Sequence, residues 1–186
     1  MPASYRPLLP TLSKVLERII LTRMKKITTE QNLIPSRQFG FRNKHATIEQ
    51  IHRLTNKITH ALEYKQYCTA LFLDIEKTFD KVWHEGLLHK IGQKFPKPYY
   101  KLVETYLKQR TFFVKHQDEC SDTYNIEASV PQGSVPFLYI IYTSDISATN
   151  ETDTFTFADD TAILFAPTAQ IDILQKHIAK LEEWLH

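Results

Sequence analysis

The stretch that decides the fold covers residues 154–165 and reads TFTFADDTAILF. Its β-branched and aromatic residues favour a strand on each side of two adjacent carboxylates, Asp159 and Asp160. Acidic residues are depleted in strands, so the pattern predicts a hairpin with the acidic pair at or near its turn. Two carboxylates held close repel each other and raise a pKa unless a cation lies between them. This peptide alone also fits a solvated acidic turn without a chemical role.

A second strand pattern ends in another acid. Residues 69–73, TALFL, form one apolar run, which indicates a strand covered on both faces, and Asp74 follows directly. If this strand and the hairpin lie side by side in one sheet, Asp74, Asp159 and Asp160 meet at one end of it. Carboxylates are ligands that Mg²⁺ prefers, and such a group suits a two-metal site for phosphoryl transfer. The residue pattern permits this pairing but does not require it.

Hydrophobic spacing predicts helices over much of the remaining chain. One helical stripe carries Leu12, Val15, Leu16, Ile19, Ile20, Met24 and Ile27. Thr47 and Gln50 form an expected capping box for a second helix, whose expected buried face carries Ile51, Leu54, Ile58 and Leu62. Further helices are expected at 87–91, 102–107, 136–146 and 171–185, strands at 111–115 and 126–130, and a turn at 131–134. The predicted fold class is therefore α+β, with one continuous core.

Charge is distributed unevenly along the 186 residues, a length that suits one domain or slightly more. Residues 1–66 carry 12 Lys+Arg against 4 Asp+Glu, a net charge of +8, whereas residues 67–186 carry 11 against 17, a net charge of −6. A basic first third next to an acidic remainder suits a polyanion held near a cation-binding site. Chance asymmetry on solvated helices is the alternative.

The composition excludes several classes of site. Four glycines are too few, and wrongly placed, for a Walker loop or a dinucleotide fingerprint. Two cysteines are too few for a disulfide framework or a zinc site, which favours a reducing compartment. The start of the chain has no secretory pattern, and the longest apolar run, residues 135–142, is too short to span a bilayer.

Five blocks of sequence, in order and at matching spacing, resemble motifs of reverse transcriptases. Residues 73–84, 130–135 and 157–160 are similar to motifs A, B and C, and residues 5–14 and 38–42 to finger motifs. The similarity is greatest to the non-LTR retrotransposon class, jockey-like elements in particular, and covers essentially the whole chain. It implies a right-hand polymerase fold of fingers and palm. Residues 1–66 would be a basic, helical, fingers-like region and 67–186 a palm region with a fingers-like insertion around 96–130, the thumb being absent.

The resemblance implies an RNA-directed DNA polymerase that transfers nucleotides from dNTPs to a primer 3′-hydroxyl with two Mg²⁺ or Mn²⁺ ions. The expected partners are an RNA template, a DNA primer and dNTPs, with no membrane, and the expected location is the nucleus or the cytoplasm. A catalytically inactive, truncated remnant that at most binds nucleic acid is the alternative, because the family's thumb and endonuclease regions are missing. A carboxylate-cluster nuclease is supported only by the acids themselves.

The resemblance also assigns roles to single residues. Asp74 and Asp159 would be metal ligands, and Asp160 the second, more variable carboxylate beside the primer end. The expected nucleotide-binding residues are Arg42, Ile75, Phe79, Gln132 and Gly133, and the expected nucleic-acid contacts are Arg23, Lys25, Lys26, Lys44 and Arg53. The ring of Phe79 would block a ribose 2′-hydroxyl, although a single Phe also fits core packing. The fork of Arg42 suits a triphosphate, with a plain surface arginine as the alternative.

Two departures from the family pattern bear on activity. A Leu-Gly pair is lacking after Ser134, and about two residues are lacking near Tyr5. Removing two residues shortens a connection by about 3 Å in a helix and by up to about 7 Å in an extended chain. In the turn at Gln132 such a shortening is expected to misplace a nucleotide contact and to lower the rate of catalysis.

Overall fold

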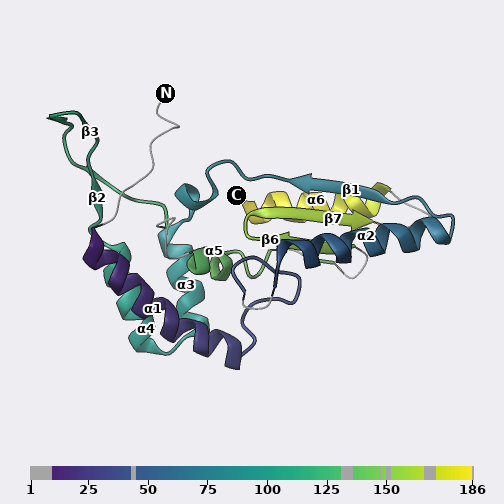
Figure 1. The fold of residues 1–186 in the computed structure, drawn as a ribbon, viewed down its shortest axis with the longest axis horizontal. Helices are drawn as coiled ribbons and strands as arrows, with labels where there is room; N and C mark the ends of the chain where they lie inside the picture. Colours follow the sequence, from purple (N-terminus) through teal and green to yellow (C-terminus); the bar gives the residue numbers. More distant parts are fainter. Residues whose placement is uncertain are drawn as a thin grey trace. The chain divides into compact units, whose positions relative to one another are not determined.

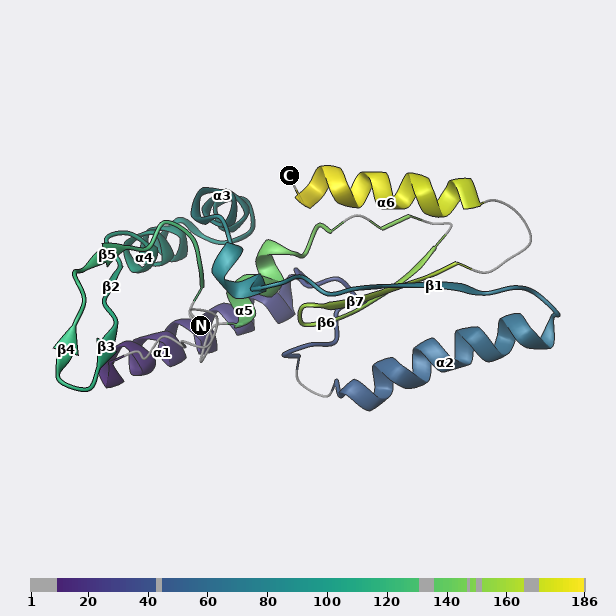
Figure 2. The same cartoon turned by 90° about the horizontal axis from the view of Figure 1, so that it is seen from above.

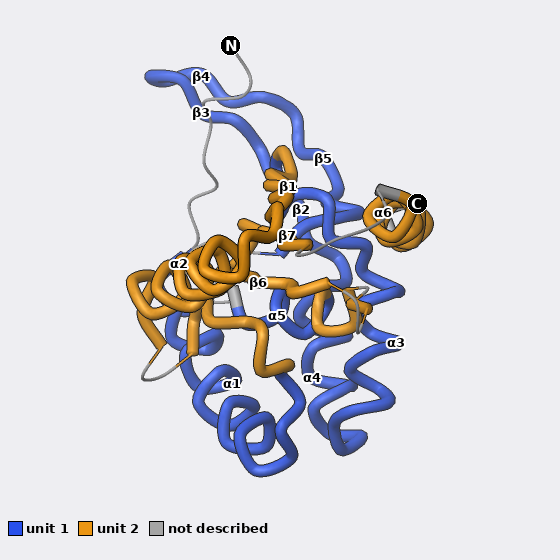
Figure 3. The backbone as a smooth tube through the Cα atoms, turned by 90° about the vertical axis from the view of Figure 1, so that its right-hand side faces the viewer, with its two compact units in different colours: residues 1–34, 77–142 blue, residues 35–76, 143–186 orange. Residues whose placement is uncertain are grey.

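The computed structural model describes residues 10–42, 45–130, 136–146, 148–149, 152–165 and 171–185 (Figure 1). The chain divides into two compact units (Figure 3). Unit 1 comprises Met1–Ile34 and Lys77–Tyr142, and unit 2 comprises Pro35–Glu76 and Thr143–His186. Each unit is thus built from two separate segments, and the expectation of one continuous core is wrong. The assignment of residues 1–66 to fingers and 67–186 to palm stays a prediction.

Unit 2 is a three-stranded antiparallel sheet between two helices (Figure 2). The strand order is β1-β7-β6, with β1 at Thr69–Leu73, β6 at Asp153–Phe157 and β7 at Asp160–Phe165. Helix α2, Thr47–Glu63, lies along one face of the sheet and helix α6, Ile171–Leu185, along the other. The hairpin predicted around Asp159 and Asp160 is therefore confirmed, and so is the pairing of the 69–73 strand with it.

Alternation along the strands explains why both faces of this sheet are apolar. Ile163 of β7 packs with Leu71 and Leu73 of β1 and with Leu174, Leu181 and Trp184 of α6. On the opposite face Phe155, Ala162 and Leu164 pack with Leu54 and Ile58 of α2 and with Cys68. The hairpin is thus held from both sides, which fixes the register in which it presents its turn.

Three expectations for unit 2 are wrong in detail. Strand β1 is not covered on both faces: Phe72 is 69% exposed, because β1 is a sheet edge and α2 packs over Phe155 on the far strand. Thr47 is the first helical residue of α2 rather than its cap. The Ala46 N–H donates to the Glu49 carboxylate at 3.0 Å, which completes the N-terminus of the helix. Gln50 is buried, while Ile51 and Leu62 are exposed.

Unit 1 contains four α-helices, a 3₁₀ turn and a narrow arm of short strands among its described residues. The helices are α1 Thr11–Glu30, α3 His84–Lys94, α4 Lys97–Leu107 and α5 Pro136–Tyr142, and the 3₁₀ turn is Thr78–Lys81. Their core includes Met24, Leu87, Ile91, Val103, Leu107 and Leu138, all nearly or fully buried. Pro98 stands in the first turn of α4, where a missing N–H costs nothing.

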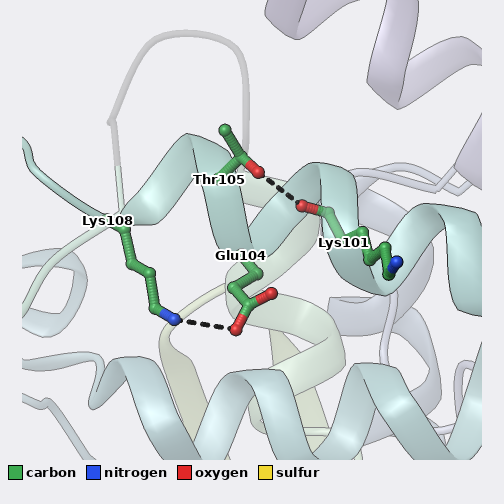
Figure 4. A network of polar contacts seen from close by, with 4 residues as sticks. All are labelled: Lys101, Glu104, Thr105 and Lys108. Atoms are coloured by element: carbon green, nitrogen blue, oxygen red, sulfur yellow. Dashed lines mark hydrogen bonds and ion pairs between the residues drawn. The ribbon is translucent and has the colours of Figure 1, made fainter.

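The outer face of α4 is polar. The Lys108 ammonium lies 2.8 Å from a carboxylate oxygen of Glu104, and the Thr105 hydroxyl donates to the Lys101 carbonyl at 2.9 Å (Figure 4). Both contacts join residues one helical turn apart, the spacing at which side chains on a helix surface meet. An exposed pair of this kind contributes little to stability, because water screens the two charges.

Three expectations for unit 1 are also corrected. Helix α1 buries Glu17, Ile20, Met24 and Thr28, while the first part of the expected stripe is exposed, with Leu12 at 83%. In the arm, β2 Thr111–Phe112 pairs with β5 Tyr124–Asn125 and β3 Lys115–His116 with β4 Glu119–Cys120, so the expected strand at 126–130 is wrong. Helix α5 ends at Tyr142 rather than near Ile146. The expected turn at 131–134 lies outside the described residues.

A buried carboxylate joins α1 to α4 in unit 1. Glu17 is fully buried, and its Oε1 accepts a hydrogen bond from the hydroxyl of Tyr106. Burial raises the pKa of Tyr106, and the bond to Glu17 raises it further, so the hydroxyl stays protonated and remains a donor. Among the described residues the other carboxylate oxygen, Oε2, has no hydrogen-bond partner. Among the described residues, the hydrogen bond from the Tyr106 hydroxyl is therefore the polar contact that stabilises the buried Glu17 carboxylate.

Tyr106→Phe is expected to lower the free energy of unfolding by about 1–3 kcal/mol, the cost of leaving a buried polar group without a partner. Urea unfolding of the purified chain measures this loss. Tyr67→Phe is the matched control, because Tyr67 is 92% exposed and its hydroxyl can be solvated by water. Equal stability of the two variants would contradict the role given to Tyr106.

Candidate functional site

The acids singled out from the sequence meet at one end of the unit 2 sheet. Phe157 pairs with Asp160 in the hairpin, so Ala158 and Asp159 form its two-residue turn. The last pair between β1 and β7 joins Leu73 to Thr161. Asp74 and Asp160 therefore occupy the next position on two neighbouring strands, with Asp159 beside them in the turn.

Their electrostatics reflect this crowding. Burial raises the pKa of Asp160, and the negative charges of Asp159 and Asp74 raise it further. Asp74 and Asp160 are exposed and Asp159 is half-buried, so all three carboxylates are accessible from solvent. The arrangement is a concentrated negative charge at the sheet end that a cation would relieve.

The donor set fits a hard divalent ion rather than a preformed metal cage. Among the described residues, no group of three or more His, Cys, Asp and Glu side chains is arranged to hold a metal by itself. Mg²⁺ is commonly bound through one or two carboxylates, with water and substrate phosphates completing its shell. Three accessible carboxylates that repel one another are compatible with that mode of binding, and they lack the nitrogen and sulfur ligands that zinc prefers.

The turn between β6 and β7 is held by a segment that precedes α2, residues 37–40, which we call the clamp segment. The side-chain amide of Gln38 accepts hydrogen bonds from the Ala158 N–H at 3.0 Å and the Gly40 N–H at 2.8 Å. The same amide donates to the Ala158 carbonyl at 3.1 Å. Gln38 is only 5% exposed. One side chain therefore satisfies both backbone groups of the first turn residue.

The backbone of the clamp segment pairs with β6 beside that turn. The Phe39 N–H donates to the Thr156 carbonyl at 2.9 Å, and the Thr156 N–H donates to the Arg37 carbonyl at 3.1 Å. Buried Gln50 of α2 donates to the same two carbonyls, at 2.9 Å to Arg37 and 3.1 Å to Thr156. The clamp segment thus extends the sheet by a short parallel bridge at the end that carries the acids.

Two arginines expected to contact substrate make contacts within unit 2. Arg42 Nη1 donates to the carbonyls of Pro35 at 3.2 Å and Gln38 at 3.1 Å, which holds the loop before α2. The Arg53 guanidinium lies 4.7 Å from the centre of the Phe39 ring, within the range of a cation–π contact. Arg53 also donates to Gln50 Oε1 at 3.0 Å. Their roles toward a triphosphate and a template stay predictions, as does that of half-buried Ile75, which follows Asp74.

The other expected site residues with described positions belong to unit 1. Phe79 is half-buried, and its ring makes an edge contact with Tyr139 at a centroid distance of 5.2 Å. Its carbonyl accepts from the Val130 N–H at 2.8 Å. The core-packing alternative for Phe79 thus has direct support, while its contact with a ribose stays a prediction. The expected nucleic-acid contacts on α1 are all exposed: Arg23, Lys25 and Lys26.

Three expected site residues lie outside the described residues, namely Lys44, Gln132 and Gly133. The two places where the sequence departs from the family pattern, near Tyr5 and just after Ser134, lie outside them as well. Within the described part of the chain, no helix combines the length and the apolar character needed to cross a membrane.

Sequence reasoning missed Gln38 and Gly40, which hold the acidic turn, and Gln50, which bonds the clamp segment to β6. Gln38 and Gly40 were quoted only as part of a finger motif, and Gln50 only as part of a cap. The sequence carried no signal of these contacts, because helical spacing puts Ile51 rather than Gln50 on the buried face, and only the structure shows that the Gln50 amide needs a partner. The partner itself is far away in sequence and no local pattern indicates it.

Comparisons with known proteins identify the family to which this chain belongs. Residues 2–186 match the family described as reverse transcriptase (RNA-dependent DNA polymerase). Three relatives from Drosophila melanogaster are similar over 97–98% of this chain. They are a probable RNA-directed DNA polymerase from transposon BS (41% identical), one from transposon X-element (43%) and the RNA-directed DNA polymerase from mobile element jockey (41%). This chain spans only 21–22% of their lengths.

A solved structure is similar in fold. It is the structure of telomerase from Candida tropicalis with a TWJ fragment of telomeric RNA, matched with a TM-score of 0.60 and 13% sequence identity. The match covers 94% of this chain and 32% of the telomerase chain. It supports a reverse transcriptase-like arrangement of helices and antiparallel sheets. The jockey-like resemblance drawn from the five sequence blocks is confirmed, and the chain belongs to the reverse transcriptase (RNA-dependent DNA polymerase) family.

Proposed function

We propose that this chain carries the nucleotidyl-transfer centre of an RNA-directed DNA polymerase from a non-LTR retrotransposon. The observation that carries the proposal is the meeting of Asp74, Asp159 and Asp160 at one sheet end, in a chain that matches the family throughout. In the proposed reaction a primer 3′-oxygen attacks the α-phosphorus of a dNTP in line. A new P–O bond forms, the bond to the β-phosphate breaks, and pyrophosphate leaves.

Each acid has a defined part in this proposal. Asp74 and Asp159 would hold two Mg²⁺ or Mn²⁺ ions, and Asp160 would lie beside the primer end. When bound, such ions lower the pKa of the attacking hydroxyl and offset charge on the leaving group. The protein's contribution is to fix carboxylates whose mutual repulsion keeps the site favourable for cations. Electrostatics and positioning then account for catalysis, since the protein forms no covalent intermediate in this reaction class.

The remaining assignments are part of the same proposal. Residues 1–66 act as fingers and 67–186 as palm, and an RNA template, a DNA primer and dNTPs are the partners, in the nucleus or the cytoplasm. Arg42, Gln132 and Gly133 would contact the incoming nucleotide, with Ile75 and Phe79 near its sugar. Exposed cations on α1 would contact the nucleic-acid backbone, where charge rather than sequence is recognised.

Primer extension tests the reaction. On an RNA template with a DNA primer, dNTPs and Mg²⁺, Asp74→Asn is expected to lower the extension rate by more than about 100-fold, since a metal ligand supports several kcal/mol of charge stabilisation. Asp153→Asn is the matched control, because Asp153 is an exposed acid at the opposite end of the same hairpin, 3.0 Å from Lys57. It should retain most of the activity.

Extension that survives Asp74→Asn would show that the carboxylate assignment is wrong. No extension by the unmodified chain, together with retained binding to a primed template, would identify an inactive remnant that only binds nucleic acid. Cleavage of RNA or DNA that needs Mg²⁺ but no dNTPs would instead favour a nuclease.

The cations of α1 give a second prediction. Replacing Arg23, Lys25 and Lys26 together by Gln is expected to weaken binding of single-stranded RNA. It should also reduce the slope of log affinity against log salt concentration by about 2, because each lost phosphate contact removes about 0.7. Fluorescence anisotropy over a salt series measures both quantities. The control replaces Lys97, Lys101 and Lys108 of α4, which are also exposed, and an equal change in both triple variants would contradict a specific role for α1.

The raised pKa of Asp160 predicts how stability depends on pH. A carboxyl whose folded-state pKa exceeds its unfolded value destabilises the fold at pH above the folded pKa, and the penalty disappears as the pH falls below the unfolded value. Asp160→Asn is therefore expected to raise the melting temperature at pH 7 but not at about pH 3, below the ordinary Asp range. Added Mg²⁺ should narrow the difference at pH 7 by stabilising the unmodified chain.

Thermal unfolding at both pH values, with and without Mg²⁺, measures this effect. Asp118→Asn serves as the control, because Asp118 lies in the exposed turn between β3 and β4 of unit 1. A lower melting temperature for Asp160→Asn at pH 7 without Mg²⁺ would contradict the repulsion inferred among the three acids.

A further inference from the structure

The turn that carries Asp159 begins with a residue in an unfavourable backbone conformation. Ala158 has a φ of 59°, in the left-handed region that glycine tolerates and alanine rarely adopts. A two-residue hairpin turn with a positive φ at its first position normally has Gly, Asn or Asp there, and not Ala. Such a conformation persists only where the surrounding structure determines it from several sides.

Gln38 holds Ala158 in this conformation through hydrogen bonds. Its amide oxygen accepts from the Ala158 N–H and its amide nitrogen donates to the Ala158 carbonyl. Both backbone groups of the strained residue are therefore hydrogen-bonded to one side chain. Gln38 itself is buried and is anchored by a bond from the Gly40 N–H. A hydrogen-bonded pair of this kind sets the orientation of the peptide groups on both sides of Ala158.

Close packing of the clamp segment restricts the same turn sterically. A Cβ added to Gly40 would lie 2.1 Å from the Ala158 nitrogen and 2.7 Å from its Cα, both backbone atoms. Real contacts are never that short, so Gly40 is required for the backbones to approach. Movement of Ala158 toward Gly40 is blocked, and movement away breaks the bonds to Gln38.

We infer that Gln38 is a positioning residue of the acidic site: by holding Ala158 in a left-handed turn, it fixes the direction in which Asp159 and Asp160 present their carboxylates toward Asp74. It touches no substrate and acts through the backbone of the turn. The inference rests on the proposed function, because it assigns Gln38 to the binding of divalent cations by those acids. Residues behind metal ligands have this effect in other metal sites, where their loss lowers affinity by 10–100-fold.

Gln50 offers a matched control for this assignment. Like Gln38 it is a buried glutamine that makes several hydrogen bonds to the same part of unit 2. Its amide nitrogen donates to the carbonyls of Arg37 and of Thr156 within β6, its amide oxygen accepts from Arg53, and none of these bonds reaches the turn. Gln38→Met and Gln50→Met therefore both remove a buried amide, but only the first releases Ala158.

The experiment measures Mn²⁺ affinity by electron paramagnetic resonance and amide exchange by NMR, with unfolding followed in parallel. Gln38→Met is expected to weaken Mn²⁺ binding by about 10-fold or more and to accelerate exchange of the Ala158 amide. Gln50→Met is expected to lose stability but to keep a Mn²⁺ affinity and an Ala158 exchange rate close to those of the unmodified chain. If Gln38→Met does not fold, Gln38→Glu replaces it, because a carboxylate still accepts from both amides but cannot donate to the Ala158 carbonyl.

Several results would overturn the inference. Equal losses of Mn²⁺ affinity in Gln38→Met and Gln50→Met would leave Gln38 with a role in stability alone. Ala158 exchange in the unmodified chain at the rate of an unstructured peptide would show that the clamp does not form. Unchanged Ala158 exchange in Gln38→Glu would show that the donated bond does not hold the turn. Absence of Mn²⁺ binding by the unmodified chain would refute the proposed function instead, and a protected Ala158 amide would then still establish the clamp.

Discussion

The pairing of β1 with β7 is the interaction on which the acidic cluster of this chain depends. Asp74 follows β1 in one segment of unit 2 and Asp160 begins β7 in the other segment, 86 positions later in the sequence. Five registered pairs, from Thr69 with Phe165 to Leu73 with Thr161, bring the two carboxylates to neighbouring positions. Because a shift of one residue would turn every side chain of β1 to the other face, the packing of Leu71 and Leu73 under α6 also sets where Asp74 lies.

That geometry opposes the electrostatics of the folded chain. Like charges at a sheet end raise the free energy of the fold. The pKa of Asp160 is raised by burial first and then by the negative charges of Asp159 and Asp74. The fold offsets this cost with apolar contacts on both faces of the hairpin and with the hydrogen bonds of the clamp segment. Functional sites commonly combine backbone strain and charge repulsion with rigid surrounding structure. Reverse transcriptases generally use divalent metal ions, and a bound cation would relieve this repulsion.

Local patterns predicted the hairpin and the longer helices, but they did not predict the short strands of the arm or which residues each element buries. The alternation on either side of Asp159 predicted the hairpin, because a strand's period is a property of a few consecutive residues. Exposed Phe72 and exposed Leu12 were expected to be buried, because burial depends on which helix covers the residue and not on its own spacing. The contact of the clamp segment with the turn could not be predicted from local patterns either, because Gln38 and Ala158 are 120 residues apart in the chain. The acids were found from sequence through the resemblance, whereas their support required the structure.

The interleaving of the two units has a consequence for how the protein is made. During synthesis α2 and β1 emerge well before β7, so β1 has no partner strand until residues 160–165 have been translated. Contacts between residues so distant in sequence slow folding, since the loop between them must close before any pairing stabilises it. Meanwhile the apolar edge that includes Phe72 stays accessible to other chains. Nascent copies are therefore exposed to misassociation until the hairpin arrives, which makes chaperone supply and translation rate determinants of the yield of this protein.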